Sequence, residues 1–410
     1  MKKPNVRLFR FSSLLFFSLL FPAAVFVLSE AFALKQDIQH EAIAVNIEVP
    51  VRVYSKGNVI DNLKIEDFEL YDDGKLQKID ALYFLKHSEI TRMESREELP
   101  DNLPVIQPDT QRHFVLIFQM MKYLPEVGEA LDYFFSDVLQ KDDTLVVMSP
   151  IKTYQFRKED FQKAPLVGFA DQLKAKLKKD ILDYSFEYGA LLRQLIQAMS
   201  NSSGEDGSVS WNMIRMLLER MRDHIYLDPT RVKNFASYLN DLEGQKHVIL
   251  LFQNELMPFP KTDAIHDPYG QKELLKAELV QESGLNVEEI RNYFADSSIH
   301  FHFSYITRRE NQILDIERQQ SFGSMEMQFV EFKQDLFSVF KDIADTTGGI
   351  TDSSYNARIS FQKAVEAVEN YYLLYYTPNN YRADGKYHTI KLKIKDGGYR
   401  IVHRQGYIAD

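Results

Sequence analysis

Two glutamines end strongly apolar segments of this sequence, at positions where a metal-binding or catalytic α/β domain usually has aspartate. Gln119 follows the segment His113–Phe118, and Gln253 follows the segment His247–Phe252. Both segments are short and rich in β-branched and aromatic residues, which predicts strands buried on both faces of a parallel sheet. Ligands of such sheets bind at the carboxyl ends of the strands. The sequence therefore places amides, not carboxylates, at the expected binding edge.

Two other groups of side chains could bind a metal ion. Asp263, His266 and Asp267 lie in a proline-containing segment and have the ligand types of a Zn²⁺ or Mn²⁺ site, although such clusters in loops are usually only solvated. His300 and His302 share one face of an expected strand and could chelate an ion. The phenylalanines that alternate with them favour an ordinary strand, at an edge of the sheet.

The sequence contains none of the common catalytic motifs. It has no cysteine, no Gly-x-Ser-x-Gly elbow, no glycine-rich phosphate loop and no His-Glu-x-x-His helix. We therefore predict a protein without enzymatic activity and without a cofactor. The alternative is a catalytic triad assembled in space, which no sequence pattern can reveal.

The first 33 residues have the pattern of an export signal. Four basic residues precede an apolar run from Phe11 to Leu28, and Ala31-Phe32-Ala33 forms a small-x-small cleavage site. We predict a signal peptide at 1–33 and a periplasmic or extracellular protein. The alternative is an uncleaved membrane anchor, because the run is close to the minimum length that spans a bilayer.

Composition argues against nucleic acid as a ligand. The chain has a net charge of −10, and removal of the signal, which carries +3, leaves about −13. Such a charge repels a phosphate backbone. Aromatic residues form 13% of the chain, enough for a packed core with some adhesive surface, so the expected partner is a protein.

Residues 38–86 are predicted to form strands. Apolar residues alternate with smaller or polar ones between positions 43 and 53, which is the period of a half-buried strand. Strands expected at Phe68–Tyr71 and Gln77–Phe84 flank Asp72-Asp73-Gly74, whose residues suit a hairpin turn better than a calcium site. Residues 87–112 are polar and contain three prolines, which predicts a linker.

Residues 113–350 are predicted to form a doubly wound α/β domain with a mostly parallel sheet. Strands and helical patterns alternate, which implies right-handed crossovers. The expected strands are His113–Phe118, Asp143–Met148, His247–Phe252 and Ser298–Tyr305. The expected helices after the first crossover are Ala170–Leu182, Tyr188–Met199, Ser210–Ile225, Arg231–Leu242, Val287–Phe294 and Phe332–Thr346, the last ending at Gly348-Gly349.

Residues 351–410 are predicted to contain a helix near Ser360–Asn370 and a further β segment. Tyr371–Tyr376 is expected to be a strand, and Gly397-Gly398 suggests a terminal hairpin between His388–Ile394 and Tyr399–His403. Each terminal β segment has too few strands to be stable alone. We therefore expect the two to pair into one small sandwich.

Two stretches carry a resemblance to a known family. The first comprises Leu63, Asp67, Phe68, Tyr71, Asp73, Gly74, Gln77 and Ile79. The second comprises Ala344, Thr347-Gly348-Gly349, Tyr372–Pro378, Asp384-Gly385-Lys386 and Arg404–Tyr407. Through these motifs the chain resembles secreted bacterial proteins with a von Willebrand factor type A-related domain, of the type described from acidobacteria. The resemblance covers nearly the whole chain after the signal.

The resemblance implies the type A fold but not its metal. Type A domains hold a divalent cation with Asp-x-Ser-x-Ser after the first strand, a loop threonine and a later aspartate. Here the first motif aligns to Gln119, Met121 and Tyr123, and the later aspartate aligns to Gln253. Mg²⁺ prefers carboxylate and hydroxyl oxygens, so an amide and a thioether predict no metal at this position.

Together these observations predict a non-enzymatic, exported or envelope-associated protein that mediates protein–protein interaction or adhesion without a metal. Gln119, Met121, Tyr123 and Gln253 are the candidate partner-binding residues, because methionine and tyrosine suit adaptable interfaces. The same residues could instead only fill a vacated site. A scaffold component of a surface assembly and an envelope hydrolase with a spatially assembled site are the other candidates.

Overall fold

The computed structural model describes residues 45–87, 89–95, 108–200, 211–225, 227–253, 256–260, 286–295, 298–307, 327–331, 336–395 and 397–409. The predicted signal peptide, residues 1–33, and the loop residues Asp263, His266 and Asp267 lie outside these ranges. Within them, no helix has the length and apolar character needed to cross a bilayer. The described residues belong to one unit, Ala44–Asp410.

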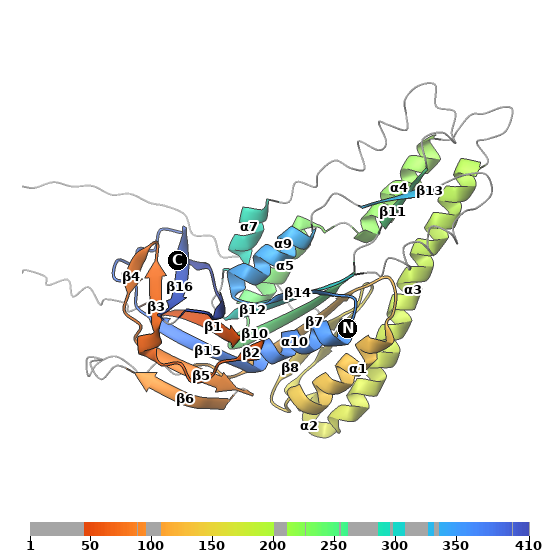
Figure 1. The fold of residues 1–410 in the computed structure, drawn as a ribbon. Coiled ribbons are helices and arrows are strands. Elements are labelled where there is room, and N and C mark those ends of the chain that lie inside the picture. Colours follow the sequence, from red (N-terminus) through yellow and green to blue (C-terminus); the bar gives the residue numbers. More distant parts are fainter. Residues whose placement is uncertain are drawn as a thin grey trace, which may run out of the picture. The chain divides into compact units, whose positions relative to one another are not determined.

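A six-stranded, mostly parallel sheet organises the middle of the chain (Figure 1). Five neighbouring strands are parallel, and the edge strand β9 is antiparallel to β8. In spatial order the strands are β14 (Thr351–Ser354), β12 (Ile299–Ile306), β10 (Gln245–Phe252), β7 (Arg112–Gln119), β8 (Thr144–Met148) and β9 (Thr153–Phe156). All eight residues of β10 are buried, as expected for a central strand covered on both faces.

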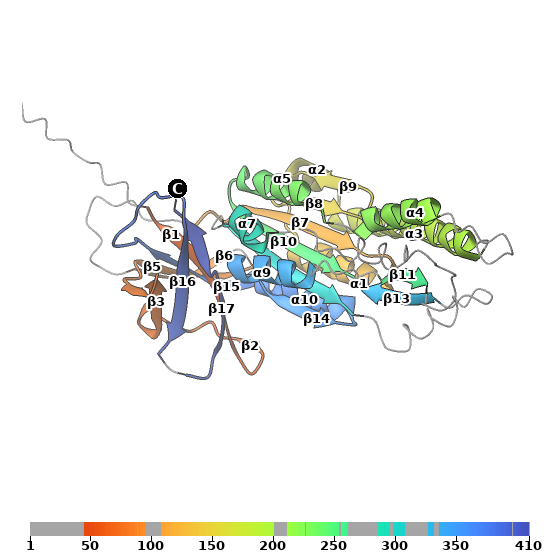
Figure 2. The ribbon, with the colours of Figure 1, turned by 90° about the horizontal axis from the view of Figure 1, so that it is seen from above.

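Helices cover both faces of this sheet, which confirms the predicted α/β architecture (Figure 2). One face carries α1 (Pro125–Tyr133), which continues as a π-helical turn at Phe134–Val138, together with α3 (Leu166–Ser200) and α10 (Ala357–Glu369). The other face carries α5 (Pro229–Asn240), α7 (Val287–Tyr293) and α9 (Leu336–Thr347). The short helix α2 (Lys158–Lys163) adds Phe161 to the first of these two cores.

The helix α3 is longer than the sequence predicted. Two helices were expected between residues 170 and 199, but one helix of 35 residues runs through both. The exposed Leu182 and Phe186 disturb the apolar pattern there, whereas Tyr184 and Tyr188 continue the buried stripe, and no proline interrupts it. The first half of α3 packs in the core beside the sheet, and the helix also packs along α4 (Trp211–Ile225).

The two ends of the chain pair with each other, as expected from their few strands. One sheet has the order β17 (Arg400–His403), β1 (Ile47–Ser55), β15 (Asn370–Tyr376), β5 (Ala81–Lys86), β6 (Glu89–Ser95), with β2 (Asn58–Val59) on β1. A second has the order β18 (Gly406–Ile408), β16 (Tyr387–Ile394), β3 (Phe68–Asp72), β4 (Lys75–Gln77). Their facing side chains share one hydrophobic core, which also includes Ile65 from the short 3-10 helix Ile65–Asp67. A separate two-stranded pair joins β11 (Leu256–Pro260) and β13 (Met327–Glu331).

One predicted strand pairing is wrong, and a second is only partly right. The terminal hairpin does not form: β16 pairs with β3 and β18, whereas β17 pairs with β1 in the other sheet. The hairpin at Asp72-Asp73-Gly74 does form, between β3 and β4, but its second strand is Lys75–Gln77 and not the expected Gln77–Phe84, because the chain then crosses to the other sheet as β5. The turns have the positive φ angles that a hairpin needs, but burial of both strand faces decides the partners.

Some element boundaries also differ from the expected segments. The strand β6 lies in the range predicted as a linker, and β14 and α10 belong to the parallel-sheet layer although the sequence placed them with the C-terminal segment. The helix α9 ends at Thr347, where Gly348 has the predicted left-handed conformation, with a φ of 71°. A Cβ at Gly349 would lie 1.9 Å from the carbonyl oxygen of Phe301, so the helix end approaches β12 too closely for any other residue.

A fully buried arginine joins the antiparallel layer to the parallel-sheet layer. Val49, Val51 and Val53 face the core of the antiparallel sheets, so Arg52 points from β1 to the opposite side. Its guanidinium donates to the carbonyl oxygens of Ala367 and Gly348, at the C-terminal ends of α10 and α9. Cations are favoured at these helix ends, whose carbonyls lack intrahelical donors. No carboxylate of the described residues forms an ion pair with Arg52.

Histidines from the amino ends of the parallel strands form the other side of this contact. His247 of β10 and His300 of β12 are register neighbours with ring centroids 4.9 Å apart. His300 lies 3.2 Å from Arg52 through Nδ1 and 2.9 Å from the Gln245 side-chain oxygen through Nε2, an arrangement that suits the neutral ring. Neither ring nitrogen of His247 has a hydrogen-bond partner within the described residues.

We expect Arg52→Met to destabilise the protein strongly. The change leaves the carbonyls of Gly348 and Ala367 buried without their donor, which should lower the free energy of unfolding by about 2–4 kcal/mol. Urea unfolding followed by circular dichroism measures this. Arg382→Met, at an exposed arginine, is the matched control and should change the free energy by less than about 0.5 kcal/mol. Equal effects of the two substitutions would contradict the role assigned to Arg52.

We expect stability to fall as the pH drops below the ordinary histidine pKa of about 6.5. Burial, and then the nearby Arg112, lowers the pKa of His247 well below that value, and burial does the same for His300 and His302. The unfolded chain therefore binds more protons in acid, so the folded state loses stability there. The loss should reach about 1.4 kcal/mol per pH unit for each such histidine.

His247→Phe should reduce this loss of stability in acid, which we call the acid limb, without loss of stability at pH 8. The substitution removes no hydrogen bond, and the new ring would lie beside Phe114. Unfolding free energies measured between pH 5 and 8 provide the test. His388 is a control of opposite sign: although burial opposes it, hydrogen bonds to Asp384 and Asp73 raise its pKa, so its stabilisation is complete below about pH 6.5 and is lost as the pH rises. His388→Phe should therefore lower stability in acid without flattening the fall of stability below about pH 6.5. An unchanged slope in His247→Phe would rule out the buried ring as the cause.

Candidate functional site

The strands β7 and β10 are neighbours at the point where the strand order of the parallel sheet reverses. The helix that follows β7, α1, packs on one face, whereas α7, which comes between β10 and β12 in the sequence, packs on the other. In doubly wound sheets, the ligand crevice lies outside the carboxyl ends of the strands at this point. Gln119 and Gln253 meet here, since the N–H of Gln253 donates to the carbonyl of Gln119 at 2.9 Å.

The four residues predicted to bind a partner are placed around this edge but differ in exposure. Gln119 and Tyr123 are half-buried, whereas Met121 and Gln253 are buried. The ring of Tyr123 lies 5.8 Å from the ammonium of Lys178 on α3. The side-chain oxygen of Gln253 has no hydrogen-bond partner in the described part of the chain. Only Gln119 and Tyr123 therefore present substantial surface of their own.

The side chain of Gln119 belongs to a hydrogen-bonded chain with a helix residue. Its amide nitrogen lies 3.3 Å from the hydroxyl of Tyr184 on α3, and that hydroxyl donates to the backbone carbonyl of His224 on α4. The Gln119 amide, the Tyr184 hydroxyl and the His224 carbonyl are all uncharged, so this chain of hydrogen bonds at the end of β7 is neutral.

The carboxylate near the end of β8 comes from α3 and is already occupied. Asp180 is 1% exposed and accepts hydrogen bonds from Ser149 at 2.8 Å and from Tyr154 at 2.7 Å. Lys152 pairs with its other oxygen at 3.3 Å. The bonds to Asp180 help raise the pKa of Tyr154 to about 12, after the larger effect of burial. Asp180 thus fixes the turn between β8 and β9 against α3.

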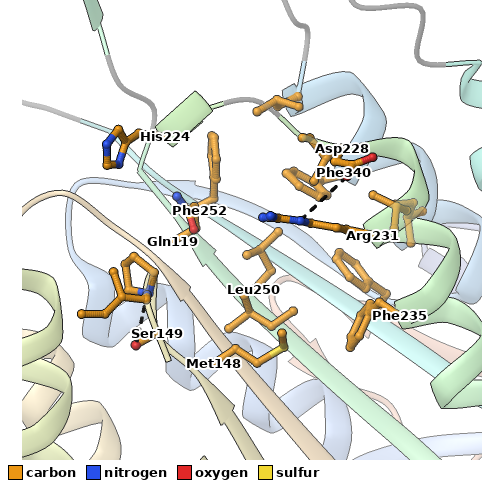
Figure 3. A pocket seen from close by; sticks show the side chains of 18 of the residues that line it. Gln119, Met148, Ser149, His224, Asp228, Arg231, Phe235, Leu250, Phe252 and Phe340 are labelled. Atoms are coloured by element: carbon orange, nitrogen blue, oxygen red, sulfur yellow. Dashed lines mark hydrogen bonds and ion pairs between the residues drawn. The ribbon is translucent and has the colours of Figure 1, made fainter. Parts of the chain in front are cut away.

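A cavity of about 490 Å³ opens beside Gln119 on the α5 and α9 face of the sheet (Figure 3). Its floor consists of side chains from the parallel strands, namely Ile117, Gln119, Met148, Leu250, Phe252 and Phe301. Val232 and Phe235 of α5 and Phe340 and Ile343 of α9 line its walls. Pockets of this size, mostly apolar with a few polar groups, are typical of small-molecule sites.

The mouth of the cavity carries charges of both signs. Asp228 caps α5 by accepting from the N–H of Thr230 at 2.9 Å, and its other oxygen lies 3.8 Å from Nε of Arg231. Figure 3 shows the Arg231 side chain above Leu250, with Asp228 beside it. Asp223 and His224 from α4 line the same mouth. The mouth therefore carries two carboxylates and one guanidinium, of which Asp228 and Arg231 form an ion pair.

Sequence reasoning found Gln119 but missed the rest of the cavity. Asp228-Pro229-Thr230 is a helix-start signal that places Arg231 in the first turn of α5, so the sequence could have predicted the position of these two charged residues on one helix end. Tyr184, His224 and the wall phenylalanines come from distant segments, and each fits an ordinary amphipathic pattern. Periodicity indicates that such residues are buried, but it does not tell which of them enclose a hollow.

The histidine pair predicted as a possible chelate is part of the core. His300 and His302 are fully buried in β12, which lies between β10 and β14, so the expectation of an edge strand is wrong. His302 Nδ1 lies 3.3 Å from the N–H of Ile350, and His300 contacts Arg52. The rings therefore serve the contact between layers and not a surface metal site.

Among the described residues, one group of three ligand-type side chains is close enough to share an ion, namely Asp72, Asp73 and His388. Asp72 is buried and accepts hydrogen bonds from the hydroxyls of Tyr376 and Tyr407, both at 3.0 Å on the same oxygen. Burial and the Asp72 charge raise the pKa of both tyrosines, which keeps them as donors. Asp72 thus binds strands of two sheets together.

The other two members of this group are also engaged. Asp73 accepts from the N–H of Thr389 at 2.9 Å, and His388 lies 2.9 Å from Asp73 and 3.3 Å from Asp384. Both ring nitrogens of His388 therefore have carboxylate partners. Asp73 has a φ of 45°, the conformation that the sequence predicted for a turn at this point. The arrangement is that of a braced hairpin turn.

No protein-family model matches the chain, and neither a curated protein nor a solved structure was found to match it. The site itself offers aromatic and aliphatic surface, an amide and a hydroxyl beside a mouth of mixed charge. Binding through burial of apolar surface is the chemistry that this arrangement supports best.

We expect divalent cations to leave the stability of the protein unchanged. A site with a dissociation constant of about 10 µM would add about 2.7 kcal/mol to the free energy of unfolding at about 1 mM cation. Urea unfolding in Mg²⁺, Ca²⁺ or Mn²⁺, compared with chelator, should show no such gain because Asp72, Asp73 and His388 are already hydrogen-bonded. A gain that disappears in His388→Gln would show that these residues do hold an ion.

Proposed function

We propose that this chain is a non-enzymatic, exported or envelope-associated protein with a type A-like domain that binds a protein partner without a metal. The observation that carries the proposal is the pair of amides, Gln119 and Gln253, at adjoining strand ends where the sheet order reverses. This is the binding edge of doubly wound sheets, and here it lacks a carboxylate at both strand ends.

The strand order supports the type A-like part of the proposal. In order of appearance, the six strands of the parallel sheet are arranged third, second, first, fourth, fifth and sixth. Doubly wound sheets have this order. Together with the sequence motifs of the resemblance, it favours a type A-like fold in which the cation position carries neutral side chains.

Exposed apolar side chains at the same edge support a protein partner. Ile151, in the turn after β8, is 41% exposed and lines the mouth of the cavity. Phe337, in the first turn of α9, is 36% exposed and contacts Tyr305 near the end of β12 with ring centroids 5.3 Å apart. With Tyr123, these side chains form what we call the edge patch. Aromatic and aliphatic residues of this kind are common in interface cores.

The export part of the proposal depends on residues 1–33, whose sequence has the features of a signal peptide. A surface scaffold or an envelope hydrolase would be the alternatives, but no contact of the described residues favours either. Asp180, the carboxylate nearest Ser149, is held by Tyr154 and Lys152 in a turn, which is a structural arrangement.

The test is crosslinked capture from the envelope fraction in chelator, with the protein lacking residues 1–33. We expect a specific protein that is captured by the wild type and lost when Tyr123, Ile151 and Phe337 of the edge patch are changed to alanine. The matched control changes Leu76 and Ile90, which are 61% and 41% exposed on the antiparallel sheets, to alanine. Both variants are checked for unchanged unfolding before use.

The captured protein is then purified and titrated against the three proteins. We expect the edge variant to bind about tenfold or more weakly, because a few central side chains carry most interface energy, and the control to bind as the wild type does. Equal affinity of wild type and edge variant, or a requirement for added Mg²⁺, would refute metal-free binding at this edge.

A further inference from the structure

Five phenylalanines form a continuous aromatic surface within the cavity. The ring centroids of Phe235 and Phe294 are 6.3 Å apart, those of Phe294 and Phe301 are 5.8 Å apart, and Phe301 stacks on Phe340 at 6.2 Å. Phe340 then contacts Phe252 at 5.7 Å. All five line the same hollow, although they come from α5, α9, two strands and the turn after α7. Such rings favour edge-to-face or offset contacts with another aromatic ring.

This aromatic surface is not shared with the edge patch. Phe294 and Phe301 are 1% and 2% exposed, so a partner that lies across the sheet edge cannot touch their rings. A molecule small enough to enter a hollow of about 490 Å³ would instead contact the partly exposed rings of Phe235 and Phe340, behind which Phe294 and Phe301 pack. The deep part of the cavity therefore suits a small molecule, and burial of its apolar area would provide the binding energy.

The charges at the mouth restrict the class of that molecule. An anion that approaches Arg231 also meets Asp228, which lies 3.8 Å away, and Asp223. A cation that approaches these carboxylates meets Arg231 in turn. Either ion would also lose water on entry to an aromatic interior, which is costly without a partner of its own. An uncharged molecule avoids both penalties.

One neutral polar group lines the cavity where it meets the carboxyl edge of the sheet. The amide of Gln119 donates to Tyr184 through its nitrogen, which leaves its carbonyl oxygen as an acceptor for a hydroxyl group. Gln119 lines the cavity together with Tyr184 and lies next to Phe252 in Figure 3. A hydroxyl on the ligand would bond there while an aromatic body lies against the phenylalanines.

We propose that this cavity binds a small, uncharged aromatic molecule with a hydroxyl group, independently of the protein partner. The phenylalanines supply the contact area, Gln119 receives the hydroxyl, and the cost of removing water from an ion in an aromatic interior excludes ionic analogues. The protein then has two binding functions, one at the exposed edge patch and one in the interior behind it.

The experiment titrates the protein with three fluorinated naphthalenes of matched size, followed by fluorine NMR. They are a fluoronaphthol, the corresponding naphthoate and the corresponding naphthylmethylamine. We expect the naphthol to bind about tenfold or more tightly than either ion, because each ion must lose water to enter the aromatic interior. Tighter binding of the naphthoate or the amine would overturn the proposed ligand class, and no binding of any probe would overturn the site.

Variants locate the bound probe. Val232→Phe and, separately, Ile343→Phe add a ring from a cavity wall and should each weaken naphthol binding about tenfold by occupying its volume. Val167→Phe, at a valine that is 63% exposed and outside the cavity, is the control and should bind as the wild type does. Unfolding midpoints show which of the two wall variants is folded, and only the binding data of a folded variant are interpreted.

Gln119→Leu keeps the shape of the side chain but removes the acceptor. It should reduce the preference for the naphthol over a fourth probe, the fluoronaphthalene without a substituent. Unchanged affinity in a folded wall variant would place the probe elsewhere and refute the proposal. Failure of the naphthol to bind would leave partner capture by the edge patch unaffected, so the two proposals fail separately.

Discussion

The contact of Arg52 with two helix ends is the interaction on which the rest of the structure depends. It brings a strand from the beginning of the chain to α9 and α10, which lie near its end, and it satisfies carbonyls that no backbone donor reaches. A guanidinium can do this because its five N–H donors are fixed in one plane. Burial of this cation lowers its pKa, yet the carbonyls and the His300 ring replace the lost water.

This contact divides the parallel sheet into a structural end and a free end, which is the proposed binding end. The amino ends of β10 and β12 carry His247 and His300 and are covered by the antiparallel layer, where Tyr371 of β15 lies 5.3 Å from the His300 ring. The carboxyl ends are left free of that layer. Because the first end is fixed by buried polar groups, the second can carry neutral side chains and a hollow without loss of the fold.

The binding end combines three features that have one physical origin. Amides at the ends of β7 and β10, the Gln119–Tyr184 contact and the balanced charges of Asp228 and Arg231 all keep the local field weak. A weak electric field does not hold a hard cation, but neutral groups of this kind cost little free energy to dehydrate. In both proposals, apolar surface and shape decide what binds, in the interior cavity and at the exposed edge alike.

The sequence alone determined the parallel sheet, the position of Gln119 and Gln253 at its carboxyl edge, the turn at Asp73 and the left-handed glycine after α9. These follow from local periodicity and backbone conformation, which neighbouring residues specify. Only the tertiary structure decided that β16 pairs with β3, that His300 lies in a central strand and that Arg52 reaches two helix ends. It also decided which phenylalanines enclose a cavity. Those features depend on contacts between residues far apart in the chain, because packing of both sheet faces, and not the local pattern, selects among otherwise similar partners.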